Sequence, residues 1–278
     1  MNPSEPQDRY VDINGLRMHY LDWGNRGLQP MLLLHGFSAH AHIWDTFAPS
    51  FSSHYHVIAL DQRGHGETEC PEEAAYTLDD HFADIVCLTE ELHLKDIVLI
   101  GHSMGGRNAL FYTACMPENV DRLVLVDARP GNDPQGSKAL EHLLTNLPLQ
   151  SGSIDHIVQK VRSLFPYLSR DVGQNIVSHG YNKLNNGQFV PKYDVRMSLD
   201  TERAGYLVED LWVFLGNVVC PTLVVRGKES PFISRQEARK MCRFIPTAEL
   251  KEIPDSTHLP LLENPMVFGD VVSDFLGL

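Results

Sequence analysis

Gly101-His102-Ser103-Met104-Gly105 is the segment of this sequence whose residues best fit catalysis. It follows the apolar run "DIVLI" at residues 96–100 and precedes a helical pattern at residues 104–115. A tight turn between a strand and a helix needs small residues beside the serine and holds its hydroxyl above the sheet. The helix N-terminus also favours negative charge there. We therefore predict that Ser103 is a nucleophile; the alternative is a glycine-rich loop that packs the helix on the strand.

Attack by Ser103 on a carbonyl would develop an oxyanion, which two backbone N–H groups must stabilise. The residue after the nucleophile, Met104, provides one of them. We assign the other to Phe37 in His35-Gly36-Phe37, which ends the apolar run of residues 31–34. His35 precedes a glycine at a strand end, so we interpret its side chain as bracing the loop by hydrogen bonds.

His258, in "DSTHLPLLENP", is the predicted general base for Ser103. A histidine can accept and return a proton near neutral pH because its ordinary pKa is about 6.5. The chain contains 14 histidines, and this one comes last and follows the last strand pattern. We expect surface or core roles for His19, His54, His56, His65, His81, His93, His142, His156 and His179.

Apolar runs and helical patterns alternate along most of the chain, which indicates a doubly wound, mostly parallel sheet. A hairpin around Asn14-Gly15 precedes them. The alternation stops between residues 130 and 217, where short amphipathic helices are expected instead. We therefore predict a core of residues 1–129 and 218–278. Residues 130–217 would form a helical cap over the carboxyl ends of the strands, where such sheets bind ligands.

"HGF" at residues 35–37, "DQRGHG" at 61–66, "GHSMGG" at 101–106 and "STH" at 256–258 occur in this order. With these motifs the chain resembles the α/β-hydrolase fold from about residue 10 to residue 278. The resemblance implies a serine, acid and histidine triad, an eight-stranded, mostly parallel sheet, and the insertion as a lid. It implies neither a metal nor an organic cofactor. Relatives with haloalkane dehalogenase or epoxide hydrolase chemistry need an aspartate where this chain has Ser103.

The acid of the implied triad has two candidates. The commonest pattern of the family places an aspartate three residues after the glycine that ends "TLVVRG", and that position is Ser230 here. Glu229 is one residue early. Asp127 ends the run "DRLVLVD", and some α/β hydrolases carry their acid after that strand. We favour Asp127 and keep Glu229 as the alternative; a turn-capping role for Asp127 is also possible from sequence.

A serine hydrolase that cleaves a carboxylic ester through an acyl-enzyme is the function that these residues favour. The alternatives are an amidase or C–C bond hydrolase on the same triad, and a slow or non-catalytic ligand-binding receptor. Substrate contacts are expected from side chains near the nucleophile and in the cap, and these are His40, Trp44, Arg129, Phe165 and Tyr181. Arg129 has a second interpretation as a member of a surface salt bridge.

Composition restricts the partners and the compartment. The net charge is −13 without any basic run, which argues against nucleic acid and anionic membrane surfaces as partners, and a small-molecule ester or amide is expected. Five cysteines without a CxxC pattern predict neither disulfides nor a zinc site. The polar start "MNPSEPQDRY" shows no signal-peptide pattern. We predict a cytoplasmic monomer or homodimer.

Overall fold

The computed structural model describes residues 5–131, 133–199 and 210–278. Residues 1–4 of the polar start, and residues 132 and 200–209 of the predicted cap, lie outside the described residues. None of the helices in these ranges is long and apolar enough to cross a bilayer.

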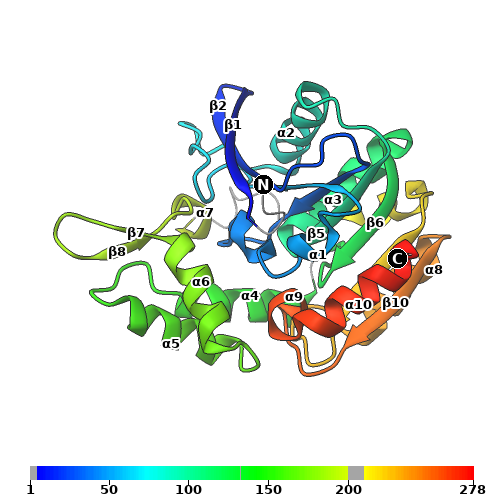
Figure 1. Cartoon of the computed structure of the whole chain (residues 1–278). Helices are drawn as coiled ribbons and strands as arrows, with labels where there is room; N and C mark the ends of the chain where they lie inside the picture. Colours follow the sequence, from blue (N-terminus) through cyan, green and yellow to red (C-terminus); the bar gives the residue numbers. More distant parts are fainter. Residues whose placement is uncertain (1–4, 132, 200–209) are drawn as a thin grey trace.

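An eight-stranded sheet forms the centre of the molecule (Figure 1), in the order β1-β2-β4-β3-β5-β6-β9-β10. β1 and β2 pair antiparallel, as do β2 and β4, and the other neighbours are parallel. The predicted eight-stranded, mostly parallel sheet is therefore confirmed. The strands are β1 (Gln7–Ile13), β2 (Leu16–Asp22), β3 (Pro30–Leu34), β4 (His56–Leu60), β5 (Ile97–His102), β6 (Val120–Val126), β9 (Thr222–Gly227) and β10 (Ala248–Ile253).

The hairpin of β1 and β2 turns at Asn14 and Gly15, which both have positive φ angles, 50° and 75°. Two consecutive residues in this region define the hairpin turn whose twist matches that of the strands, and Asn-Gly adopts it at low cost. The turn predicted from the sequence is therefore present.

Helices cover both faces of the sheet, because alternate side chains of each buried strand point to opposite faces. Leu33 and Ile100 pack on one face and Leu32 and Leu99 on the other. The first face is covered by η1 (Ala41–Trp44), α1 (Ala48–Phe51), α9 (Pro260–Glu263) and α10 (Pro265–Leu276). The second is covered by α2 (Leu78–Glu91), α3 (Met104–Cys115), η4 (Leu211–Asn217) and α8 (Arg235–Phe244), and η2 (Pro117–Asn119) follows α3.

Described residues 133–199 and 210–217, between β6 and β9, are called the inserted segment here. Its first three helices agree with the short amphipathic helices expected there from the sequence, and a short hairpin follows and projects at the left of Figure 1. Leu143, Ile157 and Val177 of these helices join the same apolar cluster as η1 and α10. Before η4, the segment consists of α4 (Pro134–Asn146), α5 (Ile154–Leu164), α6 (Arg170–Gly180), β7 (Tyr181–Lys183), β8 (Phe189–Pro191) and α7 (Arg196–Leu199).

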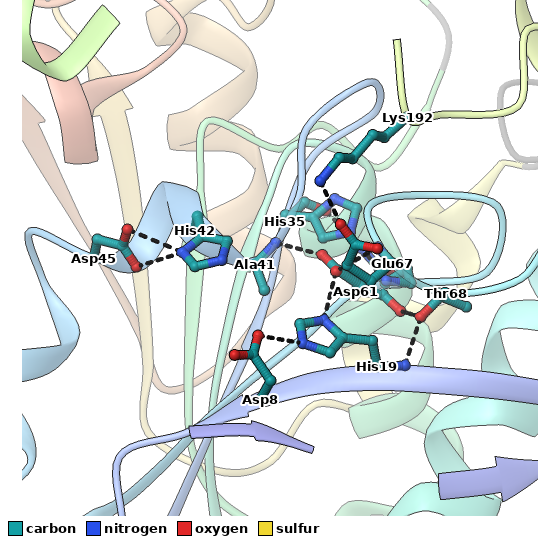
Figure 2. Close-up of polar contacts among 11 residues, drawn as sticks. Asp8, His19, His35, Ala41, His42, Asp45, Asp61, Glu67, Thr68 and Lys192 are labelled. Carbon is teal, nitrogen blue, oxygen red and sulfur yellow. Dashed lines mark hydrogen bonds and ion pairs between the residues drawn. The ribbon is translucent and has the colours of Figure 1, made fainter. Parts of the chain in front are cut away.

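Asp61, directly after β4, fixes the loops around the carboxyl ends of the strands (Figure 2). Its buried carboxylate accepts hydrogen bonds from the backbone N–H groups of Ala41 (2.6 Å) and Glu67 (2.9 Å), and lies 2.7 Å from His19 Nδ1. Arg63 forms a two-pronged ion pair with Asp84 on α2. Asp61 and Arg63 of the "DQRGHG" motif therefore have structural contacts and brace the loops that surround Ser103.

Candidate active site

Ser103 lies in a sharp turn between β5 and α3, with φ 53° and ψ −115°. Its backbone N–H donates to Val126 O (2.9 Å) on the neighbouring strand. The turn requires close backbone contact, because a Cβ atom at Gly105 would lie 2.5 Å from the carbonyl oxygens of Leu34 and His35. This packing holds a conformation that is unfavourable for a residue with a side chain, and strain of this kind concentrates at functional sites.

His258 connects Ser103 to Asp127. Its Nε2 atom lies 2.9 Å from Ser103 Oγ and its Nδ1 atom lies 2.7 Å from Asp127 Oδ2. The three residues come from the end of β5, the end of β6 and the loop after β10, so parallel strands bring them to one edge of the sheet. The His258 ring is buried and stacks on Phe232, with 3.6 Å between ring centroids. This packing leaves the ring little freedom to turn away from the serine.

Asp127 is the carboxylate beside the histidine, and Glu229 is placed elsewhere. Asp127 accepts hydrogen bonds from Ser230 Oγ to Oδ2 (2.6 Å) and from the Gly227 backbone N–H to Oδ1 (3.0 Å). Glu229 is exposed, and its carboxylate accepts from the backbone N–H of Ser256 (3.1 Å). Sequence reasoning did not assign Ser230 a contact, although an unexpected serine at the commonest acid position was the available signal.

Burial shapes the ionisation of this group. Removal from water lowers the pKa of His258, and the positive charge of Arg129 acts in the same direction. The imidazole is therefore neutral at pH 7, with a lone pair available for the Ser103 proton. Burial raises the pKa of Asp127, whereas the hydrogen bonds from Ser230 and Gly227 favour its charged form and oppose that rise.

The loop after β3 approaches Ser103 closely. A Cβ atom at Gly36 would lie 3.1 Å from Ser103 Cβ. His35 braces this loop: Nε2 accepts from the Gln62 backbone N–H (3.0 Å), so Nδ1 carries the proton and donates to Gly36 O (2.7 Å). The bracing role predicted for His35 is present. Phe37 and Met104 line a small cavity of about 40 Å³ together with Ser103 and His258.

A larger cavity of about 90 Å³ opens above Ser103 between the core and the inserted segment. Of the predicted substrate contacts, His40, Phe165 and Tyr181 line it. Trp44 does not, because η1 turns its indole inward, where it is fully buried in the core against Phe47. Its expected role as a lining residue is therefore corrected to core packing. Most of the wall is apolar, and its branched aliphatic residues are Ile43, Leu140, Leu143, Leu147, Val161, Ile176, Val177, Leu259 and Leu262.

Arg129 lies at the small cavity and not at the large one. Its guanidinium donates to Asp133 O (2.9 Å) and lies 3.7 Å from the Asp133 carboxylate. The salt bridge considered from the sequence is thus present, although the arginine side chain is mostly buried. Arg107 of α3 lines the same small cavity and donates to Arg129 O (3.1 Å).

The sequence that forms this sheet and this site also matches a known protein family. The family model described as alpha/beta hydrolase fold matches residues 29–265. This chain belongs to the α/β-hydrolase family. The resemblance seen in its motifs is thereby confirmed, and the fold is that of an α/β hydrolase.

Individual relatives of this α/β hydrolase are named as hydrolases of different kinds. Mouse epoxide hydrolase 4 is 37% identical over 169 residues, which cover 60% of this chain and 43% of that protein. The 2-(acetamidomethylene)succinate hydrolase of Mesorhizobium japonicum is 26% identical over 268 residues, covering 96% and 94%. A crystal structure of E-2-(acetamidomethylene)succinate hydrolase superposes with a TM-score of 0.88 at 25% identity, covering 99% of this chain and 100% of the other. These names share hydrolysis but differ in the compound hydrolysed, and another relative is named as a chloroperoxidase.

Proposed function

We propose that this α/β hydrolase cleaves carboxylic esters of apolar acids through an acyl-enzyme. The observation that carries the proposal is the series of contacts from Asp127 through His258 to Ser103, 2.7 Å and 2.9 Å, beside an apolar cavity. Ser103 is the nucleophile, His258 the general base, and Asp127 the acid that orients the imidazole and stabilises its protonated form.

In the first half of the reaction, Ser103 Oγ attacks the ester carbonyl carbon while its proton passes to His258 Nε2. When the C–O bond to the leaving alcohol breaks, the alcohol takes this proton and the acyl group stays on Ser103. In the second half, His258 accepts a proton from water as the water oxygen attacks the acyl carbon. Breaking the bond to Ser103 Oγ then releases the acid, and the serine regains its proton.

The oxyanion of each step is stabilised by the backbone N–H groups of Met104 and Phe37. Met104 is the first residue of α3, so its N–H has no acceptor within the helix. Phe37 follows Gly36, the residue that packs against Ser103. Both residues line the small cavity beside Ser103, which supports this assignment.

The large cavity favours an uncharged acyl group. None of the described residues that line it is Asp, Glu, Lys or Arg, and its neutral polar atoms lie among aliphatic side chains. Burying a charged group in such a wall without a partner would be costly. Leu140, Val161 and Ile176 of the inserted segment form part of the wall, which supports a role for residues 130–217 as a cap that selects the substrate.

A second candidate is hydrolysis of an amide or a C–C bond in an anionic substrate. Arg107 and Arg129 at the small cavity favour it, because guanidinium groups pair well with carboxylates. It also agrees with the name of the succinate hydrolase relative. Epoxide hydrolysis, named for the mouse relative, is less well supported. Family members with that chemistry need an aspartate at the position where this chain has Ser103.

The test is a panel of p-nitrophenyl esters with increasing acyl length, next to matched anilides and a β-diketone. We expect ester kcat/KM to exceed that of the other classes and to rise with acyl length until the cavity is filled. Ser103→Ala should lower kcat about 10⁶-fold. Turnover of anilides or the β-diketone alone would support the second candidate. Binding without Ser103-dependent turnover of any class would support the non-catalytic receptor.

A comparison of Asp127→Asn with Glu229→Gln tests the acid. Asp127→Asn should lower kcat about 10⁴-fold, because the amide presents the wrong partner to the imidazole N–H. Glu229→Gln, an equivalent change at an exposed site, should leave kcat within about twofold of wild type. Loss of activity in the glutamine variant alone would show that the assignment is wrong.

Cytoplasmic location and a monomeric or homodimeric state stay predictions.

A further inference from the structure

His42, Asp45 and His179 form a cluster outside both cavities, where the inserted segment meets the core. His42 belongs to η1 and Asp45 follows it, whereas His179 lies near the end of α6. One ligand atom from each of the three side chains lies within 4.8 Å of the others. His42 and Asp45, three residues apart, therefore meet the distant His179 on a partly exposed surface.

We propose that His42, Asp45 and His179 bind a divalent transition-metal ion of the zinc class that joins the inserted segment to the core. Imidazole nitrogens favour Zn²⁺, Cu²⁺ and Ni²⁺ over Mg²⁺ and Ca²⁺. Three protein ligands with a water in the fourth position are a common arrangement for Zn²⁺. The site is separate from the residues of the reaction proposed at Ser103, and it departs from the sequence prediction, which expected no metal.

The three ligand atoms are close enough for coordination after a side-chain rotation. Zinc–nitrogen and zinc–oxygen bonds of about 2.0–2.2 Å place two ligands of a tetrahedral ion roughly 3.4 Å apart. The His42 Nδ1 atom already lies 3.1 Å from Asp45 Oδ2. The rings of His42 and His179 stack with 3.6 Å between centroids at an angle of 23°, so one ring must turn out of the stack before both lone pairs can point at one ion. All three side chains are partly exposed, which leaves room for this adjustment.

The surroundings already orient the carboxylate. Asn175 Nδ2, one turn before His179 on α6, donates to Asp45 Oδ2 (3.0 Å). Outer contacts of this kind fix a metal-ligating carboxylate. Figure 2 shows both oxygens of Asp45 directed at the His42 ring. In the absence of metal, the His42 Nδ1–H group donates a hydrogen bond to Asp45. An ion bound at Nδ1 would replace that proton, and the neutral ring would carry its proton on Nε2 instead.

An ion at this position would act on the wall of the large cavity. His40, two residues before His42, lies 2.8 Å through its Nε2 atom from the carbonyl oxygen of Ile176 on α6. Both residues line the cavity. An ion that ties His179 to η1 would therefore hold α6 against the core, and should stabilise the folded chain by an amount that grows with the free metal concentration relative to Kd.

The first experiment titrates the full chain, freed of metal with a chelator, with ZnCl₂ in a calorimeter at neutral pH. We expect about one ion per chain, and a loss of affinity of at least about tenfold in His179→Phe and in Asp45→Asn. Phenylalanine keeps a ring to stack on His42 but has no ligand atom. His156→Phe, the same change at an exposed histidine of α5, is the matched control and should bind as wild type does.

Circular dichroism of each variant verifies folding before titration, and Asp45→Asn provides an independent result if His179→Phe does not fold. Failure of the wild type to bind Zn²⁺, or equal affinity in the wild type and both cluster variants, would overturn the proposal.

The second experiment separates this site from the cysteines. Co²⁺ in place of Zn²⁺ should give a visible spectrum without a thiolate charge-transfer band, because the ligands are nitrogen and oxygen. The melting temperature should rise with ZnCl₂ in the wild type and stay constant in His179→Phe. A thiolate band in the wild type, or an equal rise in the variant, would locate the ion elsewhere and refute the site.

Discussion

Three hydrogen-bond donors converge on the Asp127 carboxylate: the His258 ring, the Ser230 hydroxyl and the Gly227 backbone N–H. Ser230 is itself held, since its oxygen accepts from the Phe232 backbone N–H (3.1 Å). Phe232 in turn stacks on His258. Ser230, which occupies the commonest acid position, thus supports both Asp127 and, through Phe232, His258.

Ser230→Ala tests this support. The variant should lower kcat/KM about tenfold, since a hydrogen bond to a charged group contributes roughly 1.5–3 kcal/mol and part of it orients Asp127. Because the Ser230 hydrogen bond lowers the pKa of Asp127, its loss should raise that pKa and move the acid limb of the kcat/KM profile to higher pH. The profile from pH 4 to 9 measures this shift. If the acid limb stayed at the same pH, Ser230 would contribute packing and would not affect the pKa of Asp127.

The acid should be transferable between the two strand ends. Ser230 Oγ lies 2.6 Å from Asp127 Oδ2, so a carboxylate at position 230 would enter the same space. We expect Asp127→Asn combined with Ser230→Asp to recover about 10- to 100-fold of the kcat lost in Asp127→Asn alone. Asp127→Asn combined with Glu229→Asp is the control and should recover nothing. Equal activity of the two double variants would contradict this prediction.

At the scale of elements, the turn from β5 into α3 depends on backbone atoms in contact. Gly105 packs on the carbonyl oxygens at the end of β3, and its own N–H donates to His35 O (3.1 Å). This contact sets the height of Ser103 relative to the loop that carries Phe37. Ser103 and the two proposed oxyanion donors are therefore positioned by one helix-to-strand contact.

Gly105→Ala should disturb that contact. A Cβ atom 2.5 Å from two backbone oxygens cannot be accommodated without movement of α3, so we expect a loss of about 1–3 kcal/mol in the free energy of unfolding. Gly269→Ala in α10 is the matched control, because a Cβ there has no neighbour within 4 Å and should add up to about 1 kcal/mol. Urea denaturation measures both. Similar midpoints for the two variants would contradict the close packing.

At the scale of the whole molecule, His19 links the antiparallel edge of the sheet to the loop after β4. The ring is fully buried, with Nδ1 2.7 Å from Asp61 and Nε2 3.0 Å from Asp8 (Figure 2). Both nitrogens face carboxylates, so the protonated ring satisfies both contacts. Burial alone would lower the pKa of His19, but the hydrogen bonds and charges of Asp61 and Asp8 outweigh it and raise the pKa.

This raised pKa makes stability depend on pH. A group with a folded pKa above its unfolded value of about 6.5 contributes fully below that value and loses its contribution as pH rises through the folded pKa. The free energy of unfolding lost in His19→Gln should therefore be larger at pH 6 than at pH 9. Urea denaturation at both values measures it, with His54→Gln, a change at an exposed histidine, as control. A loss that grows with pH would contradict the protonated ring.

Much of the fold followed from local patterns. Asn14-Gly15 specified the hairpin, apolar runs specified the buried strands, and the glycines around Ser103 specified the nucleophile turn. Each of these features depends on a few neighbouring residues, whose backbone preferences and burial can be predicted from the local sequence pattern. His258 was found by its place after the last strand, because the order of strands fixes which chain segments reach the same sheet edge.

The tertiary structure decided what depends on distances between segments. The sequence left Asp127 and Glu229 open, and packing at the ends of β6 and β9 placed only the first beside His258 among the described contacts. Trp44 turned into the core and not into the cavity, and His179 met His42 across the junction of the inserted segment. Sequence determines which groups are present and in what order; the direction of each side chain is set by the packing of residues that are remote in the chain.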